Sequence, residues 1–463
     1  MLGGKKKSVQ VSPKSLEVEY NAFDVHGAVD EAGVLSASES VNCDGSDGAL
    51  KTGLGVRPWA SNQLLTFPFT TSMTGEPRSF FFFRTKMGTM ELQLPGYITV
   101  KGYCYTYTME QMGFVSRVQS NKRMEAHVTL VKDENGLADR VLVFTEKNLF
   151  ALTDSTSEFA TVGLTSCSTV IRGRVVACIA PHTLVYSAPY EPLKLTDTIC
   201  DSGRIYLSTD DGEPVAMKGL GEDLYIFRER GIQRVRLEGA ANDFKVERVE
   251  YHGGRIRGTS VGVFGDKIIF LATDGVYFFD GKKAEKKFLH MRIKPKVLQR
   301  SEEQQIIYAC AGGVADGKYL LRYHDEAGER TAVLYPDGVN GYFTQAYVGL
   351  SSCESALVCY ANNYISEVCA EGNLLPNCRY WFQSKAVDLG VKSRKLLKNV
   401  CLAGTGELDL TVTADGREQT VRVKLKEEGV AVDLMMRGQT FQFAFALQKN
   451  AELRQMRLQA VCL

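Results

Sequence analysis

The segment Asp223–Val235 (DLYIFRERGIQRV) decides the fold, because its pattern returns elsewhere in the chain. Close copies are Lys267–Phe279 (KIIFLATDGVYFF) and Arg140–Leu152 (RVLVFTEKNLFAL). Each is a run of β-branched and aromatic residues, a short polar turn and a second such run, which is typical of a β-hairpin. A recurring hairpin predicts a series of similar small sheets.

Weaker copies complete the series, and they lie at Val175–Ser187, Lys318–Tyr335, Ala356–Cys369 and from Phe80 onward. The first strands of the hairpins recur at roughly 34–62 residues, around the ~40–45 residues of a four-stranded propeller blade. The widest interval predicts an insertion between Arg84 and Arg140. We therefore expect a β-propeller of six or seven blades.

A closed ring is favoured because a single hairpin cannot bury its apolar face, whereas blades around an axis cover one another. Turn signals of the Asn-Gly and Asp-Gly type support it, since these residues tolerate the positive φ of tight turns. These dipeptides begin at Asn135, Asp211, Asp274, Asp316, Asp337 and Asp415.

Two flanking segments differ from the repeats. Residues 1–60 are rich in Gly, Ser, Asp and Ala, and predict an extended N-terminal arm whose apolar residues, such as Leu35 and Leu50, dock on another surface. Residues 61–378 hold the propeller. Residues 379–463 alternate apolar and polar side chains, as in Val421/Val423/Leu425 and Phe441/Phe443/Phe445, which predicts a C-terminal antiparallel β-sandwich.

Composition excludes several classes of function. The 463 residues carry 55 basic and 54 acidic side chains, which argues against a broad cationic surface for nucleic acid. No apolar run reaches the length of a membrane span, and the first residues lack the apolar core of a secretory signal. The 12 cysteines form no Cys-x-x-Cys pair. Several lie within apolar strand patterns (Cys178, Cys310, Cys359, Cys401), which predicts buried free thiols of a protein made in a reducing cytosol.

Catalytic and ligand motifs are weak, and we expect no catalytic, cofactor-binding or metal-binding residues and no cofactor. Ser208–Gly212 (STDDG) matches the start of the sialidase Asp-box, but that box is a structural turn and occurs here once. His252–Arg257 (HGGRIR) could bring backbone amides to an anion, and otherwise is a loop between blades. Phe80–Phe83 is either a partner anchor or, as we favour, a strand buried on both faces.

The three segments in this order resemble the propeller-containing tail-nozzle or tail-hub proteins, also called packaged-DNA-stabilising proteins, of double-stranded DNA phages. The resemblance rests on Gly27–Asp30, Ala37–Asn42 and Gly48–Gly55 before the first blade, Leu224–Arg234 within the repeats, and Ser384–Gly390, Arg437–Phe443 and Ala451–Leu458 in the terminal segment. It covers nearly the whole chain.

The resemblance implies a structural virion protein, not an enzyme, assembled in the host cytoplasm. Copies would form a homo-oligomeric ring or nozzle that contacts other tail or portal-adaptor proteins, while DNA passes through without specific binding. Two alternatives stay open. One is a carbohydrate-binding or glycan-cleaving propeller for receptor attachment, and the other is a cellular propeller adaptor that binds protein partners.

Overall fold

The computed structural model describes residues 14–463 except 62–64, 68–75, 88–89, 121–123, 134–135, 154–156, 180, 196–200, 238–242, 297–310, 327, 345–346, 354–355, 362 and 374–377. Within these residues the structure is almost entirely β, as predicted, and the helices are two 3-10 turns, η3 (Gly258–Ser260) and η4 (Leu289–Met291). Neither has the length or apolarity to cross a membrane. The chain divides into two compact units, one mainly of residues up to 53 and from 377 onward, the other mainly of residues 54–376.

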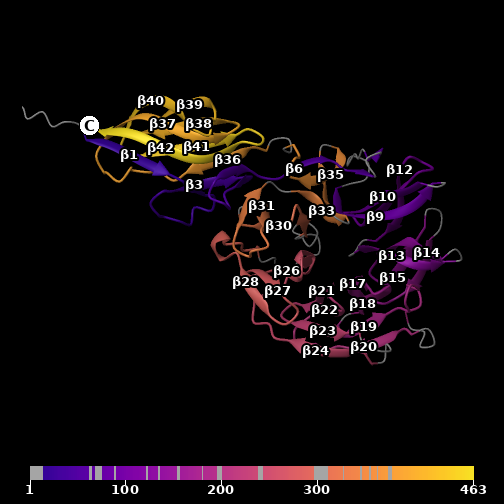
Figure 1. The fold of residues 1–463 in the computed structure, drawn as a ribbon. Coiled ribbons are helices and arrows are strands. Elements are labelled where there is room, and N and C mark those ends of the chain that lie inside the picture. The colour runs from indigo at the N-terminus through magenta and orange to yellow at the C-terminus, as the bar shows by residue number, and fades with distance from the viewer. Residues whose placement is uncertain are drawn as a thin grey trace, which may run out of the picture. The chain divides into compact units, whose positions relative to one another are not determined.

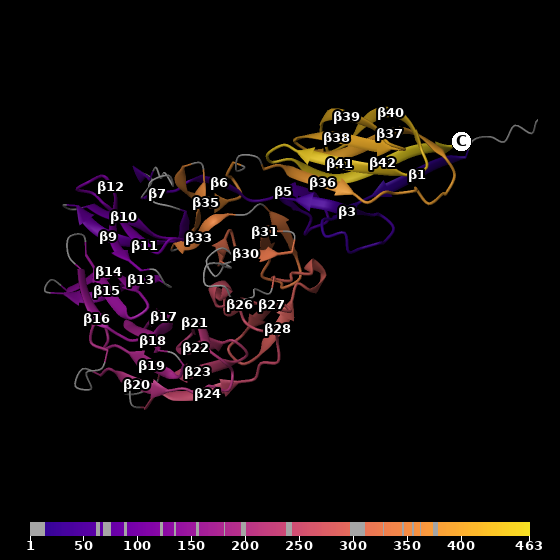
Figure 2. The same cartoon turned by 180° about the vertical axis from the view of Figure 1, so that it is seen from behind.

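The second unit is a β-propeller, and its described residues form seven four-stranded sheets around an axis (Figures 1 and 2). The first three sheets are β9 (Pro77–Met87), β10 (Met90–Thr99), β11 (Tyr103–Thr108) and β12 (Gly113–Gln119); β13 (Glu125–Asp133), β14 (Gly136–Phe144), β15 (Asn148–Leu152) and β16 (Ser157–Thr161); and β17 (Thr165–Ile171), β18 (Arg174–Ile179), β19 (Thr183–Tyr186) and β20 (Gly203–Tyr206). The next three are β21 (Pro214–Leu220), β22 (Asp223–Arg228), β23 (Ile232–Arg236) and β24 (Lys245–Val249); β25 (Gly262–Phe264), β26 (Lys267–Ala272), β27 (Gly275–Phe279) and β28 (Ala284–Lys287); and β29 (Ala311–Ala315), β30 (Lys318–Asp325), β31 (Gly328–Leu334) and β32 (Gly341–Thr344).

The seventh sheet closes the ring, because its strands come from both ends of the propeller segment. It contains β33 (Val348–Cys353), β34 (Ala356–Ala361), β35 (Tyr364–Cys369) and, as its fourth strand, β6 (Gly55–Pro58). β6 runs antiparallel to β35, with Val56 opposite Val368. A short separate pair, β7 (Ala60–Ser61) and β8 (Leu65–Thr66), follows β6. Residues 55–58, which we expected in the arm, therefore belong to the propeller.

Except for the copy that begins at Phe80, the predicted hairpins are the two middle strands of the blades, and their continuous apolar runs have a simple cause. Successive side chains of β22 point to opposite faces of the sheet. Leu224 and Ile226 enter the core shared with the third sheet, while Tyr225 and Phe227 enter the core shared with the fifth. Each middle strand is thus buried on both faces, so its sequence is a continuous apolar run and not an alternation of apolar and polar residues.

The expected insertion between Arg84 and Arg140 is absent from the described structure. The copy at Phe80 is β9, the first strand of its sheet, whereas every other predicted hairpin begins at the second strand of its sheet. The residues between are the rest of the first blade and the first strand of the second. Phe80–Phe83 is buried in the core of these blades, which confirms the interpretation as a buried strand.

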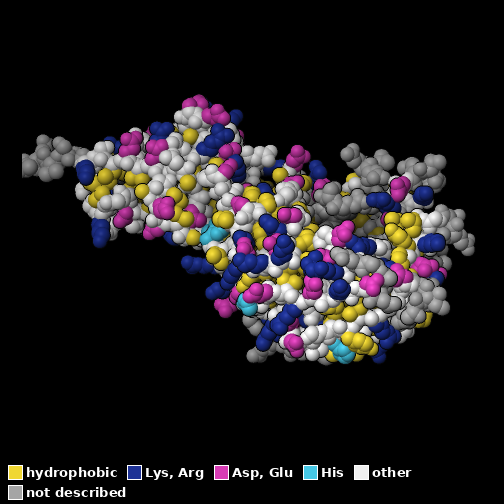
Figure 3. All heavy atoms as spheres, turned by 60° about the horizontal axis from the view of Figure 1, so that its bottom comes forward, with side chains coloured by type: hydrophobic (Ala, Val, Ile, Leu, Met, Phe, Trp, Pro, Cys, Tyr) yellow, Lys and Arg dark blue, Asp and Glu magenta, His cyan; other side chains and the backbone are white. Residues whose placement is uncertain are grey.

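Charged side chains on the propeller surface are paired locally. On the fourth blade Arg234 donates from Nε to Asp223 at 2.8 Å, and Arg236 lies 3.0 Å from Glu247 on the next strand. Basic and acidic groups are interspersed over the face seen in Figure 3. Exposed pairs such as Arg236–Glu247 contribute at most ~1 kcal/mol each to stability.

The first unit is a sandwich of two sheets (Figure 2). One sheet has the order β4-β5-β42-β37-β40, with β1 also paired to β42, and the other has the order β2-β3-β36-β41-β38-β39. Their C-terminal strands are β36 (Tyr380–Ser384), β37 (Lys395–Thr405), β38 (Glu407–Ala414), β39 (Arg417–Lys424), β40 (Val430–Gly438), β41 (Phe441–Leu447) and β42 (Glu452–Cys462).

The N-terminal segment docks, as its apolar residues predict, but as strands of the sandwich sheets. These strands are β1 (Ser15–Tyr20), β2 (Ala22–Asp24), β3 (Val34–Val41), β4 (Cys43–Asp44) and β5 (Leu50–Thr52). Leu35 and Leu50 are fully buried. The arm is therefore not a separate part, because its backbone hydrogen bonds are made by β36 and β42.

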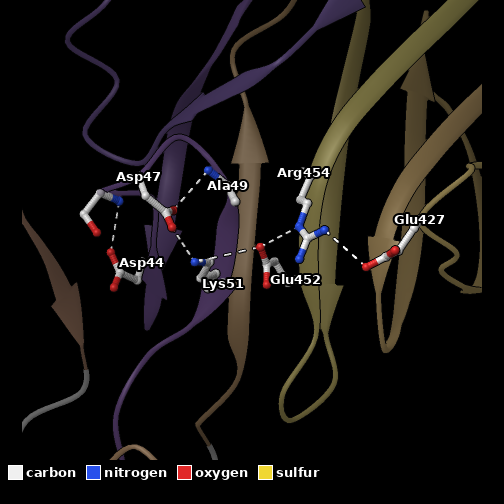
Figure 4. A network of polar contacts seen from close by, with 8 residues as sticks. Asp44, Asp47, Ala49, Lys51, Glu427, Glu452 and Arg454 are labelled. Carbon is white, nitrogen blue, oxygen red and sulfur yellow. Dashed lines mark hydrogen bonds and ion pairs between the residues drawn. The ribbon is translucent and has the colours of Figure 1, made fainter.

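A polar network accompanies this docking (Figure 4). Lys51 on β5 pairs with Asp47 and lies 3.8 Å from Glu452 on β42. Arg454 donates from Nε to Glu452 at 2.8 Å and lies 3.4 Å from Glu427. The members are largely exposed, so burial of Leu35 and Leu50 stabilises the docked segment more than these ion pairs do.

Candidate ligand site in the propeller channel

The propeller encloses an axial cavity of about 570 Å³. Its wall comes mainly from the first strands of six sheets, β9, β13, β17, β21, β29 and β33, with further residues from η3, β30 and β31. Charged members of the wall include Arg78, Glu125, Lys218, Arg322 and Glu329. A cavity of this size with convergent polar groups is the usual setting of a small-molecule site.

Three side chains of the wall form a hydrogen-bonded chain across two blades. The backbone N–H and the Oγ–H of Ser168 both donate to Glu125 Oε2, at 2.8 and 2.6 Å. His127 Nε2 lies 2.8 Å from Ser168 Oγ. Because the serine proton is directed to the carboxylate, we assign the proton of this second bond to His127 Nε2.

This order of groups does not activate the serine. A serine nucleophile needs a histidine that accepts its proton and a carboxylate that orients the histidine. Here the serine stands between the acid and the histidine, and the histidine donates. The arrangement fixes donors and acceptors in the wall and suits binding better than acyl transfer.

The channel disfavours positive charge on two of its residues. Burial lowers the pKa of His127 to about 4, with Lys218 acting in the same direction and Glu125 opposing it. Burial likewise lowers the pKa of Lys218, again against the attraction of Glu125. Both side chains keep partial access to solvent in the channel. The wall around them removes most of the water that would solvate a cation, and this desolvation outweighs the nearby carboxylate.

Other charges of the wall are held by protein partners. Arg78 donates from Nη2 to the carbonyl of Met124 at 2.8 Å, and Arg322 pairs with Glu329 at 2.7 Å. Lys218 differs, because within the described residues its amine makes no hydrogen bond or ion pair. It is the channel cation best placed to meet a ligand.

The motifs that the sequence singled out lie elsewhere. The loop of His252–Arg257 joins β24 to η3, and its amides are already used: Gly254 N–H donates to Asp274 at 2.9 Å and Arg255 N–H to Thr273 at 3.1 Å. It is a loop between blades. In the Asp-box-like segment, Ser208 Oγ donates to Asp210 at 2.7 Å, which closes a structural turn.

Sequence reasoning missed the channel residues, although one signal for them exists. Ser168 follows Glu125 by 43 residues and His127 by 41. These separations are about one blade, so the residues take equivalent places on neighbouring first strands. These two first strands, β13 and β17, carry polar residues toward the channel among their apolar ones, so hydrophobic patterning does not mark them.

The predicted thiols are largely as expected. Cys178 and Cys359 are buried free thiols, Cys401 is a half-buried one, and Cys310 lies outside the described residues.

Comparison with known proteins gives likeness of fold only. No family model and no curated protein matches the chain. Among solved structures, an N-terminal BBS1 fragment crystallised with ARL6 and soaked with lead has 14% identity and a TM-score of 0.38, over 66% of this chain and 95% of that one. The mercury-soaked form of that complex has 14% identity and a TM-score of 0.37, over 64% and 87%. KlHsv2 with loop 6CD replaced by a Gly-Ser linker has 10% identity and a TM-score of 0.34, over 54% and 79%.

Proposed function

We propose that the protein is a structural component of a phage tail, in which copies assemble into a ring or nozzle around the DNA channel. The proposal rests on the resemblance of its three segments, in order, to tail-nozzle and tail-hub proteins. It places the protein in the virion after assembly in the host cytoplasm, in contact with other tail or portal-adaptor proteins.

One observation carries the mechanical part of the proposal. The segment of residues 15–58 completes both units, because β1–β5 extend the sandwich sheets and β6 closes the seventh blade. A closed propeller has few unpaired strand edges, and a secured N-terminal segment leaves fewer ends from which unfolding can begin. Both properties suit a wall that withstands load.

The charge pattern supports the passage of DNA without retention. The net charge is +1, and both signs are interspersed over the surface in Figure 3. Strong phosphate binding needs clustered Lys and Arg, and would slow a moving duplex.

The assembly is tested with the full-length chain. Light scattering over a concentration series and negative-stain microscopy should detect a ring of fixed copy number, which needs a heterologous interface between copies. Mass spectrometry and immunogold labelling should locate the chain in purified virions. A particle that stays monomeric at all concentrations and is missing from virions contradicts the proposal.

Carbohydrate binding at the tail surface is the second candidate. Tyr206 is 73% exposed on the outer strand β20, and its ring is stacked on His182 with centroids 5.9 Å apart. Exposed aromatic rings of this kind can pack on apolar sugar faces. The axial cavity of the propeller is a weaker candidate for sugar binding, because its described lining contains no Phe, Tyr or Trp ring. A glycan array probed with wild type and with Tyr206→Ser tests this candidate. Equal binding by the two proteins, or no binding by the wild type, removes it.

A further inference from the structure

Three sulfur atoms meet at the interface of the third and fourth blades. Cys167 and Cys178 are direct partners on β17 and β18, and both are buried free thiols. Directly opposite residues of an antiparallel pair share one face of the sheet, and both side chains belong to the buried core that also contains Met217. Cys178 Sγ also lies 3.6 Å from the Sδ of Met217 on β21. The cluster therefore joins two thiols of one blade to a thioether of the next.

We propose that Cys167, Cys178 and Met217 form a binding site for a soft monovalent cation, Cu(I), at this interface. Thiolate and thioether sulfurs are the ligands that select Cu(I) among biological metals. Sulfurs that share one ion at about 2.3 Å lie roughly 4 Å apart, close to the contact already present between Cys178 and Met217. The inference is independent of the tail proposal.

A buried cation lies beside the sulfurs. The Arg228 guanidinium is fully buried, interacts electrostatically with both cysteines, and leaves its Nη2 without a hydrogen-bond partner. Three carboxylates also act here: Asp211 and Glu213 attract Arg228, and Glu125 acts on Cys178. Arg248 pairs with Asp211, and Lys218 and Glu125 attract each other. Arg228 is thus available to balance negative charge on the sulfurs.

The charges select a monovalent ion. Binding follows Cu⁺ + 2 Cys–SH → [Cu(S–Cys)₂]⁻ + 2 H⁺, with Met217 as a neutral third ligand and the protons released to solvent. The anionic complex and the Arg228 cation sum to zero, which a buried site requires. Zn²⁺ would leave one positive charge and prefers four ligands. Within the described residues, no group of three or more His, Cys, Asp or Glu side chains exists to supply such a set.

An entry path is present. Cys167 and Met217 both line the axial cavity but are almost fully buried, so an ion in the channel comes up to two of the three ligands and enters with a small movement of their side chains. Binding would tie the third blade to the fourth. A ligand that binds only the folded chain raises its melting temperature.

The experiment titrates Cu(I) into the reduced full-length protein without oxygen, against a chromogenic Cu(I) chelator, with Ag(I) as a probe that does not change oxidation state. One equivalent should be held at least tenfold more tightly than by exposed thiols, and the melting temperature should rise. Cys167→Ala and Cys178→Ala should each lose this equivalent. Met217→Leu keeps the packing volume and should weaken binding about tenfold.

Cys359→Ala is the matched control, because Cys359 is a buried thiol of the seventh blade and its loss should leave the tight equivalent intact. Melting curves without metal check that each variant folds. Uptake that is unchanged in the Cys167→Ala/Cys178→Ala double variant, no tight equivalent in the wild type, or a Cys167–Cys178 disulfide that forms in place of the complex would each overturn the proposal.

Discussion

Val56 and Val368 lie opposite each other in the antiparallel pair that joins the two ends of the propeller segment. Val56 is buried, its N–H donates to the carbonyl of Asn373 at 2.7 Å, and its carbonyl accepts from Asn373 N–H at 2.8 Å. β6 is therefore held from both sides. β6 begins the propeller segment and is also the fourth strand of its last blade, so it joins the two ends of the ring. Its packing should therefore control the stability of the whole propeller.

Val56→Ala should lower the free energy of unfolding of the propeller by roughly 2 kcal/mol, because it removes buried methyl groups at the closure and leaves a cavity. Denaturant unfolding followed by intrinsic fluorescence measures the change. The neighbouring Arg57→Gln is the control, since Arg57 is exposed and pairs with Glu367 at 2.9 Å on the surface. That variant should change stability by less than about 1 kcal/mol. Equal effects of the two variants would show that closure does not limit stability.

The channel histidine should make the fold sensitive to acid. Burial lowers the pKa of His127 to about 4, whereas a histidine in an unfolded chain titrates near ~6.5. Between these values the unfolded chain takes up a proton that the folded chain does not. Stability therefore falls as the pH drops through this window, by up to about 3 kcal/mol.

His127→Gln removes the titrating ring and retains a donor for Ser168. Unfolding free energies of wild type and variant are compared from pH 7 to pH 4. The wild type should lose stability relative to the variant as the pH falls, and NMR should report a neutral ring above pH 5. A difference that is constant over this range would contradict the burial of His127.

Lys218 should destabilise the apo protein. Its amine is desolvated, and the lowered pKa means that burial outweighs the attraction of Glu125. Lys218→Met keeps the aliphatic chain and removes the cation, so we expect about 1 kcal/mol of added stability at pH 7. Lys218→Arg, which retains the charge, is the control and should give no gain. A less stable Lys218→Met variant would indicate that the amine has a compensating partner.

The repeat could be predicted from sequence because middle strands are buried on both faces. Leu224–Phe227 and Ile268–Leu271 are unbroken apolar runs for this reason, and they define blades without any alignment. The sequence does not decide between six and seven blades, because its copy at Phe80 is a first strand and the other copies begin at second strands. The turn after β9 lacks the Asp-Gly signal that marks several other hairpins.

Two features were beyond pattern reasoning. β37 is an inner strand of one sandwich sheet, between β42 and β40, but a register shift between Leu397 and Asn399 breaks the period of two that marks its neighbours. The channel cluster of Glu125, His127 and Ser168 depends on two strands from successive blades, and no local spacing reports which of their faces turns to the axis. Ring closure by β6 is similarly non-local, as Gly55–Pro58 is too short to read as a strand by itself.

Lys395 provides a last test, on the sandwich. It is fully buried on β37, and its Nζ donates to the carbonyls of Val391 and of Ser393, the latter at 2.6 Å. Lys395→Met should keep the packing of the aliphatic chain and leave two carbonyls without this donor. We expect a loss of about 2 kcal/mol in the unfolding free energy.

The matched control is Lys398→Met on the same strand, because Lys398 is exposed and its replacement should cost less than about 0.5 kcal/mol. Hydrogen exchange of the full-length protein separates the two units, and the loss in Lys395→Met should concentrate in β37, β40 and β42. The exchange rates of the propeller strands should remain those of the wild type, since the two compact units have separate cores. Faster exchange throughout the propeller would mean that the two units unfold together.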